Sequence, residues 1–181
     1  MSRYEQPDYT VLSSGPDYEI RHYEPYLAAE TEVPGDFDAT GNIAFRRLAG
    51  FIFGRNSTGV KMNMTVPVTR QETDAGSYRY RFVMESAYSE SELPRPTDES
   101  VSIVRIPGGY YAARRYRGRR NESAYRRVEA TLIAALSRDG VPIAGAPFSA
   151  VYDGPLTPPM LRHNEVLVSV EWPGSDSSPD R

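Results

Sequence analysis

With 181 residues, of which 39% are hydrophobic and 25% charged, the chain is expected to fold as one domain with a sizeable core. Its net charge of −3 argues against nucleic acid as a partner, and the absence of cysteine excludes disulfides and thiolate metal sites. Because no apolar stretch approaches the ~20 residues of a membrane helix and the N-terminus lacks the apolar region of a secretory leader, we expect a cytoplasmic protein without a membrane partner.

Four stretches of the first half alternate apolar and polar side chains, which predicts half-buried strands. They cover residues 18–22, 27–33, 62–68 and 78–84. Pro25 separates the first two stretches, and Pro67 places the third at an edge or a bulge. A short additional strand is expected over 9–12.

A repeat of apolar residues with helical spacing predicts a helix over about 38–53, between the two pairs of strands. Asp38 or Thr40 is expected to cap its N-terminus, and Gly54 is placed to end it. Large apolar side chains lie on more than one side of this helix. One face should therefore pack on the sheet, while the other either meets a partner subunit or offers a wall to a flat ligand.

The second half repeats the same order of elements. Its strands are expected over 101–106, 110–116, 148–152 and 165–172. A helix lies between the two pairs, with Asn121 or Ser123 as its cap and Gly140 at its end.

The predicted fold class is α+β. Two pseudo-symmetric halves, each with the order strand-strand-helix-strand-strand, form an antiparallel, eight-stranded distorted or open β-barrel that two helices flank. We expect a single domain over 1–173, with halves of about 8–86 and 100–173, and a flexible tail over 174–181.

Several spaced motifs resemble those of one known family, and they occur in the family's order. They are YEIRHYEPYLAAETEV at 18–33, AFRRLAGFIFGRN at 44–56, KMNMTVPV at 61–68, ELPRPTDESV at 92–101 and RHNEVLVSV at 162–170. Together they resemble the SOUL haem-binding family over about residues 8–172. The resemblance implies a two-half barrel akin to the GyrI type of effector-binding domain. It also implies non-covalent binding of haem b, or of another tetrapyrrole, at an apolar surface beside the first helix.

The resemblance also implies which residues bind the haem. One branch of the family is thought to use the histidine of an R-H-Y-x-P stretch as an axial iron ligand, and here that residue is His22. The first helix is the expected platform. Arg46 and Arg47 could reach the propionates, and Leu48 and Phe51 supply large apolar groups, although a solvated face is the alternative for the two arginines.

Other residues depart from the family pattern or have a structural explanation. Asn42 and Gly50 stand where the second branch carries basic residues that hold the propionates. His163 inherits no role from the resemblance. The arginine-rich run 114–120 could bind phosphate, propionate or an acidic partner, but we expect a solvated face there because glutamates are interleaved in the helix that follows.

The expected function is that of a haem or tetrapyrrole carrier or buffer, as a monomer or weak homodimer. No catalytic motif is present, so we do not expect an enzyme. The alternative is a GyrI-like module that binds a small hydrophobic cation or another protein, and a desolvated carboxylate in its cleft would favour that alternative. An enzyme that acts on haem or on a small ester is the third hypothesis.

Overall fold

The computed structural model describes residues 4–154 and 156–173, which form nine strands and two α-helices. In chain order the elements are β1 (Tyr9–Ser14), β2 (Glu19–Tyr23), β3 (Tyr26–Pro34), α1 (Gly41–Ile52), β4 (Val68–Glu72), β5 (Ser77–Val83), β6 (Val101–Ile106), β7 (Gly109–Tyr116), α2 (Glu122–Arg138), β8 (Phe148–Val151) and β9 (Asn164–Ser169). A 3₁₀ turn, η1 (Pro159–Leu161), precedes β9. The predicted tail over 174–181 lies outside the described residues.

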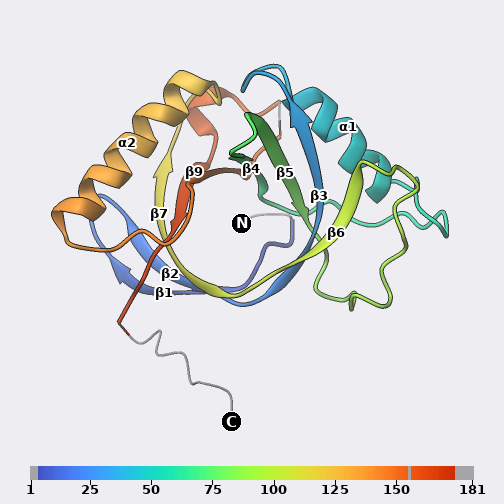
Figure 1. Ribbon diagram of the computed structural model, residues 1–181, viewed down its shortest axis with the longest axis horizontal. Helices are drawn as coiled ribbons and strands as arrows, with labels where there is room; N and C mark the ends of the chain where they lie inside the picture. The colour runs from blue at the N-terminus through green and yellow to red at the C-terminus, as the bar shows by residue number, and fades with distance from the viewer. Residues whose placement is uncertain (1–3, 155, 174–181) are drawn as a thin grey trace, which may run out of the picture.

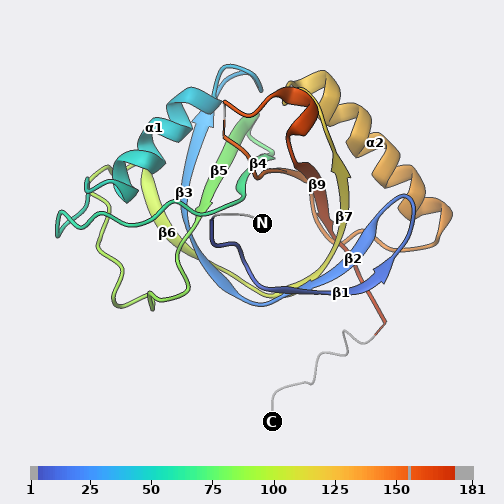
Figure 2. The ribbon, with the colours of Figure 1, turned by 180° about the vertical axis from the view of Figure 1, so that it is seen from behind.

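All nine strands belong to one antiparallel sheet, in the order β1-β2-β7-β9-β8-β4-β5-β3-β6. Only two residues separate β2 from β3, and only two separate β6 from β7. The chain therefore passes from β2 to β3, and from β6 to β7, through a tight bend. In each case the two consecutive strands lie near opposite ends of the strand order. Because β2 pairs with β7 while β3 pairs with β6, the two bends lie together and curl the sheet into a ring (Figures 1 and 2).

The order of elements confirms the predicted two-half architecture. β2, β3, α1, β4 and β5 are followed by β6, β7, α2, β8 and β9, so the pattern strand-strand-helix-strand-strand occurs twice. The strand count is nine rather than eight. The extra strand, β1, pairs with β2 at the edge of the sheet and is longer than the short strand expected over 9–12.

The strand expected over 62–68 is wrong, because the ladder begins at Val68 and continues to Glu72. Met62 and Val66 are buried, as the alternation indicated, but the segment that carries them is irregular. The amide N–H of Met62 donates to Ile52 O, at the end of α1, and Pro67 has no N–H to give to a ladder. Thr65, Val66 and Pro67 are all buried, so burial along this segment does not alternate as it would in a half-buried strand, and Thr65 forms an isolated bridge with Glu5.

The ends of both helices follow local chemistry. The Asn121 side chain accepts a hydrogen bond from Ala124 N at 3.1 Å and caps α2, which decides between the two predicted caps. Thr40 precedes α1 but makes no such bond, because its hydroxyl donates to Asp36 O instead. Gly54, at φ +112°, takes the left-handed conformation just beyond α1, as expected for a helix end.

The main core lies between the helices and the outer face of the ring. α1 packs against β3 and β5 of its own half and against β6 of the second half, whereas α2 packs against β7 and β9 of its own half (Figure 1). The side chains that anchor the helices are almost fully buried. They are Leu48, Phe51 and Ile52 from α1, and Leu132 and Leu136 from α2.

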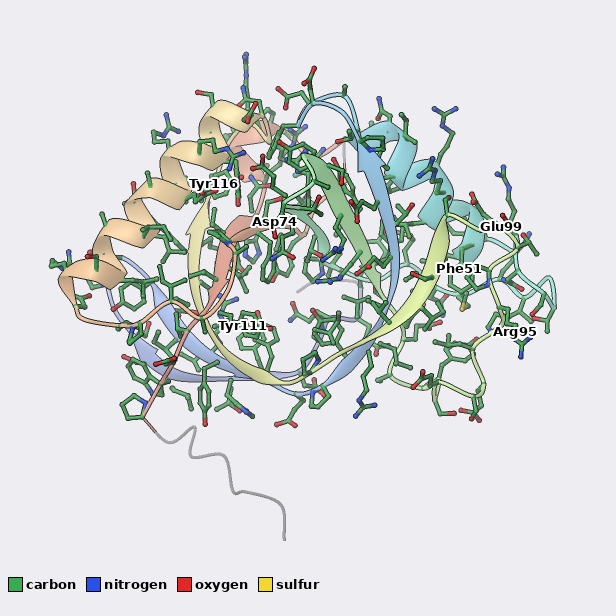
Figure 3. All side chains as sticks on the ribbon, viewed as in Figure 1. Phe51, Asp74, Arg95, Glu99, Tyr111 and Tyr116 are labelled. Carbon is green, nitrogen blue, oxygen red and sulfur yellow. The ribbon has the colours of Figure 1, made fainter. Side chains whose placement is uncertain are left out.

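A second, smaller cluster fills the inside of the ring. Tyr23, Ala113, Ala150 and Leu167 form it, and aromatic side chains such as Tyr111 pack around them (Figure 3). These residues alternate along their strands with members of the main core, such as Ala112 and Val166, and therefore face the opposite way. The ring is consequently a packed interior and not a channel.

Gly108 lies where the two bends cross, and we predict that this position accepts no side chain. A Cβ added to Gly108 would lie 2.6 Å from the carbonyl oxygen of Tyr23 and 3.1 Å from Cδ of Pro25. Gly108→Ala should therefore lower the free energy of unfolding by ~1–3 kcal/mol, the usual cost of overpacking. Gly109→Ala is the matched control, because its Cβ would meet nothing closer than 3.8 Å. Equal urea midpoints for the two variants would contradict the prediction.

Candidate functional site

A cleft of about 730 Å³ lies between the two helices, on the outer face of the ring. Its walls come from the start of α1, from β4, β5 and β8, from the β7–α2 connection and from the segment between β8 and β9. Both helices begin at this end of the molecule (Figure 1). The cleft therefore lies at the seam between the two halves, within the size range of ordinary small-molecule sites.

One wall of the cleft is apolar and aromatic. Phe45 is the exposed aromatic side chain of α1 on this side, and its ring meets Phe82 at a centroid distance of 5.4 Å. Met64, Val66 and Val68 extend the same wall. α1 thus packs on the sheet with one face and presents an aromatic side chain to the cleft with another.

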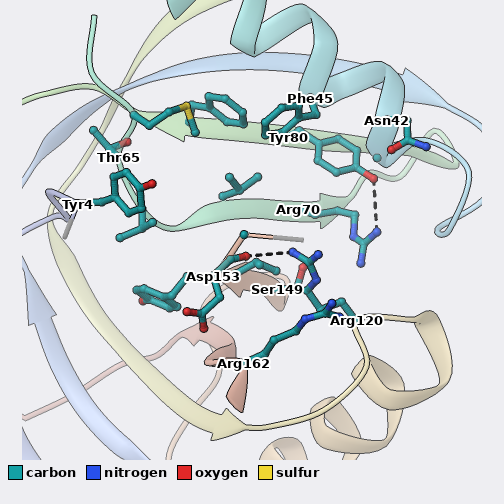
Figure 4. A pocket seen from close by; sticks show the side chains of 18 of the residues that line it. Tyr4, Asn42, Phe45, Thr65, Arg70, Tyr80, Arg120, Ser149, Asp153 and Arg162 are labelled. Atoms are coloured by element: carbon teal, nitrogen blue, oxygen red, sulfur yellow. Dashed lines mark hydrogen bonds between the residues drawn. The ribbon is translucent and has the colours of Figure 1, made fainter. Parts of the chain in front are cut away.

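The opposite wall is basic. Arg70 from β4 reaches toward Arg120 and Arg162, which come from the far side of the cleft (Figure 4), and Arg119 also lines the cleft. The Arg120 guanidinium donates to the main-chain oxygen of Asp153 at 3.3 Å. Burial, together with the charges of Arg162 and Arg70, lowers the pKa of Arg120. The three guanidinium groups therefore repel one another in a partly desolvated space, and an anion would relieve this repulsion.

Hydrogen bonds hold the Arg70 guanidinium in place, although one of its nitrogen atoms makes none. Its guanidinium donates to Phe37 O at 2.8 Å and to the Tyr80 hydroxyl at 3.4 Å. Thr40 gives its own proton to Asp36 O, so Tyr80 must donate its proton to Thr40 and accept from Arg70. The Nε atom of Arg70 is buried and donates to no described group.

Two carboxylates line the cleft, and neither is a desolvated acid. Asp38 is exposed and accepts from the N–H of Glu122, the first residue of α2, at 3.3 Å. Asp153 is partly buried and accepts the N–H of His163 through its carboxylate. Four arginines against two aspartates leave the described lining with an excess of positive charge.

Behind the cleft, a buried ion pair organises the inside of the ring. Arg21 and Glu165, with side chains 6% and 2% exposed, form a bidentate pair at 2.8 and 2.9 Å. The Tyr152 hydroxyl donates to Glu165 at 2.9 Å, and Nε2 of His163 lies 2.8 Å from the same carboxylate. Burial would raise the pKa of Glu165, but the hydrogen bonds from His163 and Arg21 lower it to about 2.

The ring of His163 connects this network to the cleft. Arg115 donates to its Nδ1 at 2.7 Å, so the proton of the neutral ring lies on Nε2 and points at Glu165. Its ring stacks on that of Tyr152 at 4.2 Å and 9°. Because Tyr152 lines the cleft, the buried network fixes the position of one of its lining side chains.

The structure does not bring the sequence-predicted haem residues together. His22 is half-exposed on β2, its ring 4.9 Å from that of Tyr110, and it does not line the cleft. Leu48 and Phe51 are buried in the main core. Arg46 and Arg47 are on α1 but do not line the cleft either.

The remaining predicted basic residues are placed differently from one another. Arg46 is exposed, whereas Arg47 donates to Thr31 Oγ1 at 3.3 Å and to Glu32 O at 3.2 Å.

Sequence reasoning missed Arg70 and Arg162. It noticed the run 114–120 but assigned it to solvent, although Arg120 directly precedes the cap of α2 and that position turns it into the cleft.

The comparisons with known proteins agree with the fold. Residues 4–169 match the family described as SOUL heme-binding protein. Heme-binding protein 2 of Homo sapiens is 36% identical over 92 residues, which are 48% of this chain and 45% of that protein. Heme-binding protein 2 of Mus musculus is 35% identical over the same length. The matched part is thus about half the length of these curated relatives.

Solved structures share the fold at low identity. A hydrolase from Listeria innocua has a TM-score of 0.64 at 12% identity and covers 88% of this chain and 94% of its own. The EcmrR C-terminal domain has a TM-score of 0.66 at 11% identity, covering 85% and 98%. SAV2435 bound to tetraphenylphosphonium has a TM-score of 0.52 at 12% identity, covering 85% and 93%. These structures support the GyrI-like architecture predicted above.

We predict that the buried carboxylate makes stability depend on acid pH. The folded pKa of Glu165 is about 2 against 4.5 for the free group, so its contribution is present above pH 4.5 and is lost as pH falls toward 2. That contribution is on the order of 3 kcal/mol. Glu165→Gln should cost ~3–5 kcal/mol at neutral pH, because it leaves Arg21 buried without its partner.

Urea unfolding at several pH values measures this dependence. The gap in unfolding free energy between wild type and Glu165→Gln should shrink between pH 4.5 and 2, and other carboxylates cancel in the difference. Glu90→Gln, at an exposed position, is the control and should track the wild type. A gap that stays constant with pH would show that Glu165 is not the titrating group.

Proposed function

The chain belongs to the SOUL heme-binding protein family, and we propose that it binds haem or a related tetrapyrrole non-covalently in the cleft between α1 and α2. The observation that carries this proposal is the division of the cleft into an aromatic wall and a basic wall. A tetrapyrrole has the same division, with a flat apolar ring and carboxylate arms on one edge. The role would be that of a carrier or buffer.

The residues of the cleft fit such a ligand. Phe45 offers an aromatic ring for the macrocycle and Tyr152 also lines the space, while Arg120 and Arg162 can form charge-assisted hydrogen bonds with the carboxylates. Arg70 also lines the cleft and reaches toward these two arginines. Haem would supply its iron chemistry when bound, while the protein's own part is to bind and orient the ligand edge.

The charge of the cleft argues against the hydrophobic-cation alternative. A solved structure with the same fold is bound to tetraphenylphosphonium, a hydrophobic cation. A cleft for such a ligand would gain from a desolvated carboxylate, but here Asp38 is exposed and Asp153 accepts a main-chain N–H. Three arginines directed at one space favour an anionic ligand instead.

The axial ligand is a separate question from the cleft. Histidine is absent from the described lining, so binding there would rest on the ring faces and the carboxylates. His22 remains the competing assignment from the family resemblance. Ligation by His22 would place the haem against β2 and Tyr110, at a different surface.

The first test is a titration of Arg120→Gln/Arg162→Gln with haemin and with metal-free protoporphyrin. Each charge-assisted hydrogen bond that is lost should weaken binding about tenfold or more. The Soret band and its stoichiometry report haemin binding, and quenching of protein fluorescence reports the porphyrin. Arg105→Gln/Arg127→Gln, two exposed arginines outside the cleft, is the matched control. Equal affinity in both double variants would reject the cleft as the site.

The second test is His22→Ala, again followed by the Soret band. Because His22 does not line the cleft, we expect an unchanged band and an affinity within about twofold of wild type, as for a surface change away from the site. A Soret band that shifts or disappears in this variant, with Arg120→Gln/Arg162→Gln unaffected, would instead establish His22 as the axial ligand.

A further inference from the structure

The segment between β8 and β9 displays apolar side chains to solvent. Leu156, Met160 and Leu161 are 97%, 72% and 62% exposed. The other large apolar side chains that are exposed in the described part of the chain range from 40% to 52%. The three most exposed apolar groups therefore lie within one short segment, a concentration that chance scatter of surface hydrophobics does not explain.

Hydrogen bonds hold residues 157–162 of this segment in place. The N–H of Gly118 donates to Pro159 O at 2.9 Å, which joins η1 to the β7–α2 connection. Inside the segment, Leu161 N donates to Pro158 O at 2.9 Å, and Nε of Arg162 donates to Thr157 O at 2.8 Å. The apolar side chains thus project from a hydrogen-bonded frame that keeps them out of the core.

Exposed arginines stand beside these apolar groups. Arg117 and Arg119 flank Gly118, the residue bonded to η1, and both are exposed. Among residues 4–154 and 156–173, neither forms an ion pair. Asp153 is the one acidic residue in the sequence between β8 and β9, and its single negative charge stands against the charges of Arg117, Arg119 and Arg162. The local charge is therefore positive although the chain carries a net charge of −3.

We propose that Leu156, Met160 and Leu161 together with Arg117 and Arg119, here called the docking corner, bind a membrane surface that carries anionic headgroups. Projecting apolar side chains can enter the boundary between headgroups and acyl chains, and guanidinium groups beside them meet the phosphates. A bilayer adapts to a narrow projection. A stable protein interface needs roughly 800 Å² from each partner, which three side chains do not provide.

The docking corner is adjacent to the ligand cleft. Arg119 and Arg162 line the cleft, and Leu161 precedes Arg162. Docking would therefore turn the mouth of the cleft toward the bilayer, where amphipathic anions concentrate. Membrane binding by the docking corner does not depend on whether the cleft takes a tetrapyrrole.

No helix in the described part of the chain is long and apolar enough to cross a membrane. The sequence-based expectation of no membrane partner concerned membrane insertion and export. Contact through the docking corner is peripheral and needs neither.

Flotation of the full chain with lipid vesicles tests the proposal. The wild type should float with vesicles of phosphatidylcholine and phosphatidylglycerol in equal parts, weakly with phosphatidylcholine alone, and less in high salt. Met160→Ser/Leu161→Ser and Arg117→Gln/Arg119→Gln should each lower the partition coefficient at least about tenfold. All four residues are exposed, and the urea midpoint of each variant verifies its fold.

Matched controls change the same chemistry elsewhere on the surface. Val11→Ser/Leu12→Ser, at 45% exposure on β1, and Arg105→Gln/Arg127→Gln should float like the wild type. A wild type that does not float with the anionic vesicles would overturn the proposal, as would equal flotation of all variants.

Two further results would assign the docking corner to a different role and so reject the proposal that it binds a membrane. One is a wild-type dimer in light scattering that Met160→Ser/Leu161→Ser dissociates while vesicle binding is unchanged. The other is a loss of haemin affinity in that variant with an unchanged partition coefficient, which would make the segment a cover for the cleft.

Discussion

The bidentate ion pair between Arg21 and Glu165 is the constraint on which the ring depends. β2 and β9 both pair with β7, and the β7 residues opposite this pair are Tyr111 and Arg115. Ala113 lies between them, and its small side chain leaves room for the guanidinium and the carboxylate to meet across the strand. Two buried charges are tolerated only when each has its partner, so the pair ties three strands into one arrangement.

The same pair connects the inside of the ring to its outer surface. Glu165 accepts hydrogen bonds from the Tyr152 hydroxyl and from the His163 ring. The main chains of Tyr152 and His163 are also joined, because Tyr152 N–H donates to His163 O at 3.2 Å. The segment between them is thereby held at its base. Its two ends give Asp153 and Arg162 to the cleft, while its middle projects to solvent. A core interaction thus sets the position of groups that a ligand would meet.

What the sequence could predict was mostly local. Asn121 caps α2 through a bond three residues away, and Gly54 follows α1, so both signals lie within a few residues of the feature they determine. The strand prediction for 62–68 failed because the alternating apolar residues of the sequence do not produce alternating burial there, since Thr65, Val66 and Pro67 are all buried. The basic wall was missed for a different reason: Arg70, Arg120 and Arg162 belong to three separate parts of the chain, and only the curled sheet brings them together.

The two halves repeat the same architecture but contribute different chemistry to the seam between them. The first half supplies Phe45 and Phe82, and hence most of the apolar wall, whereas the second supplies Arg120 and Arg162. Arg70 is the exception, since it extends from β4 of the first half toward the basic side. A symmetric fold therefore encloses an asymmetric cleft. Its polarity, apolar on one side and cationic on the other, is the property on which the proposed binding of a ligand with an apolar body and an anionic edge depends.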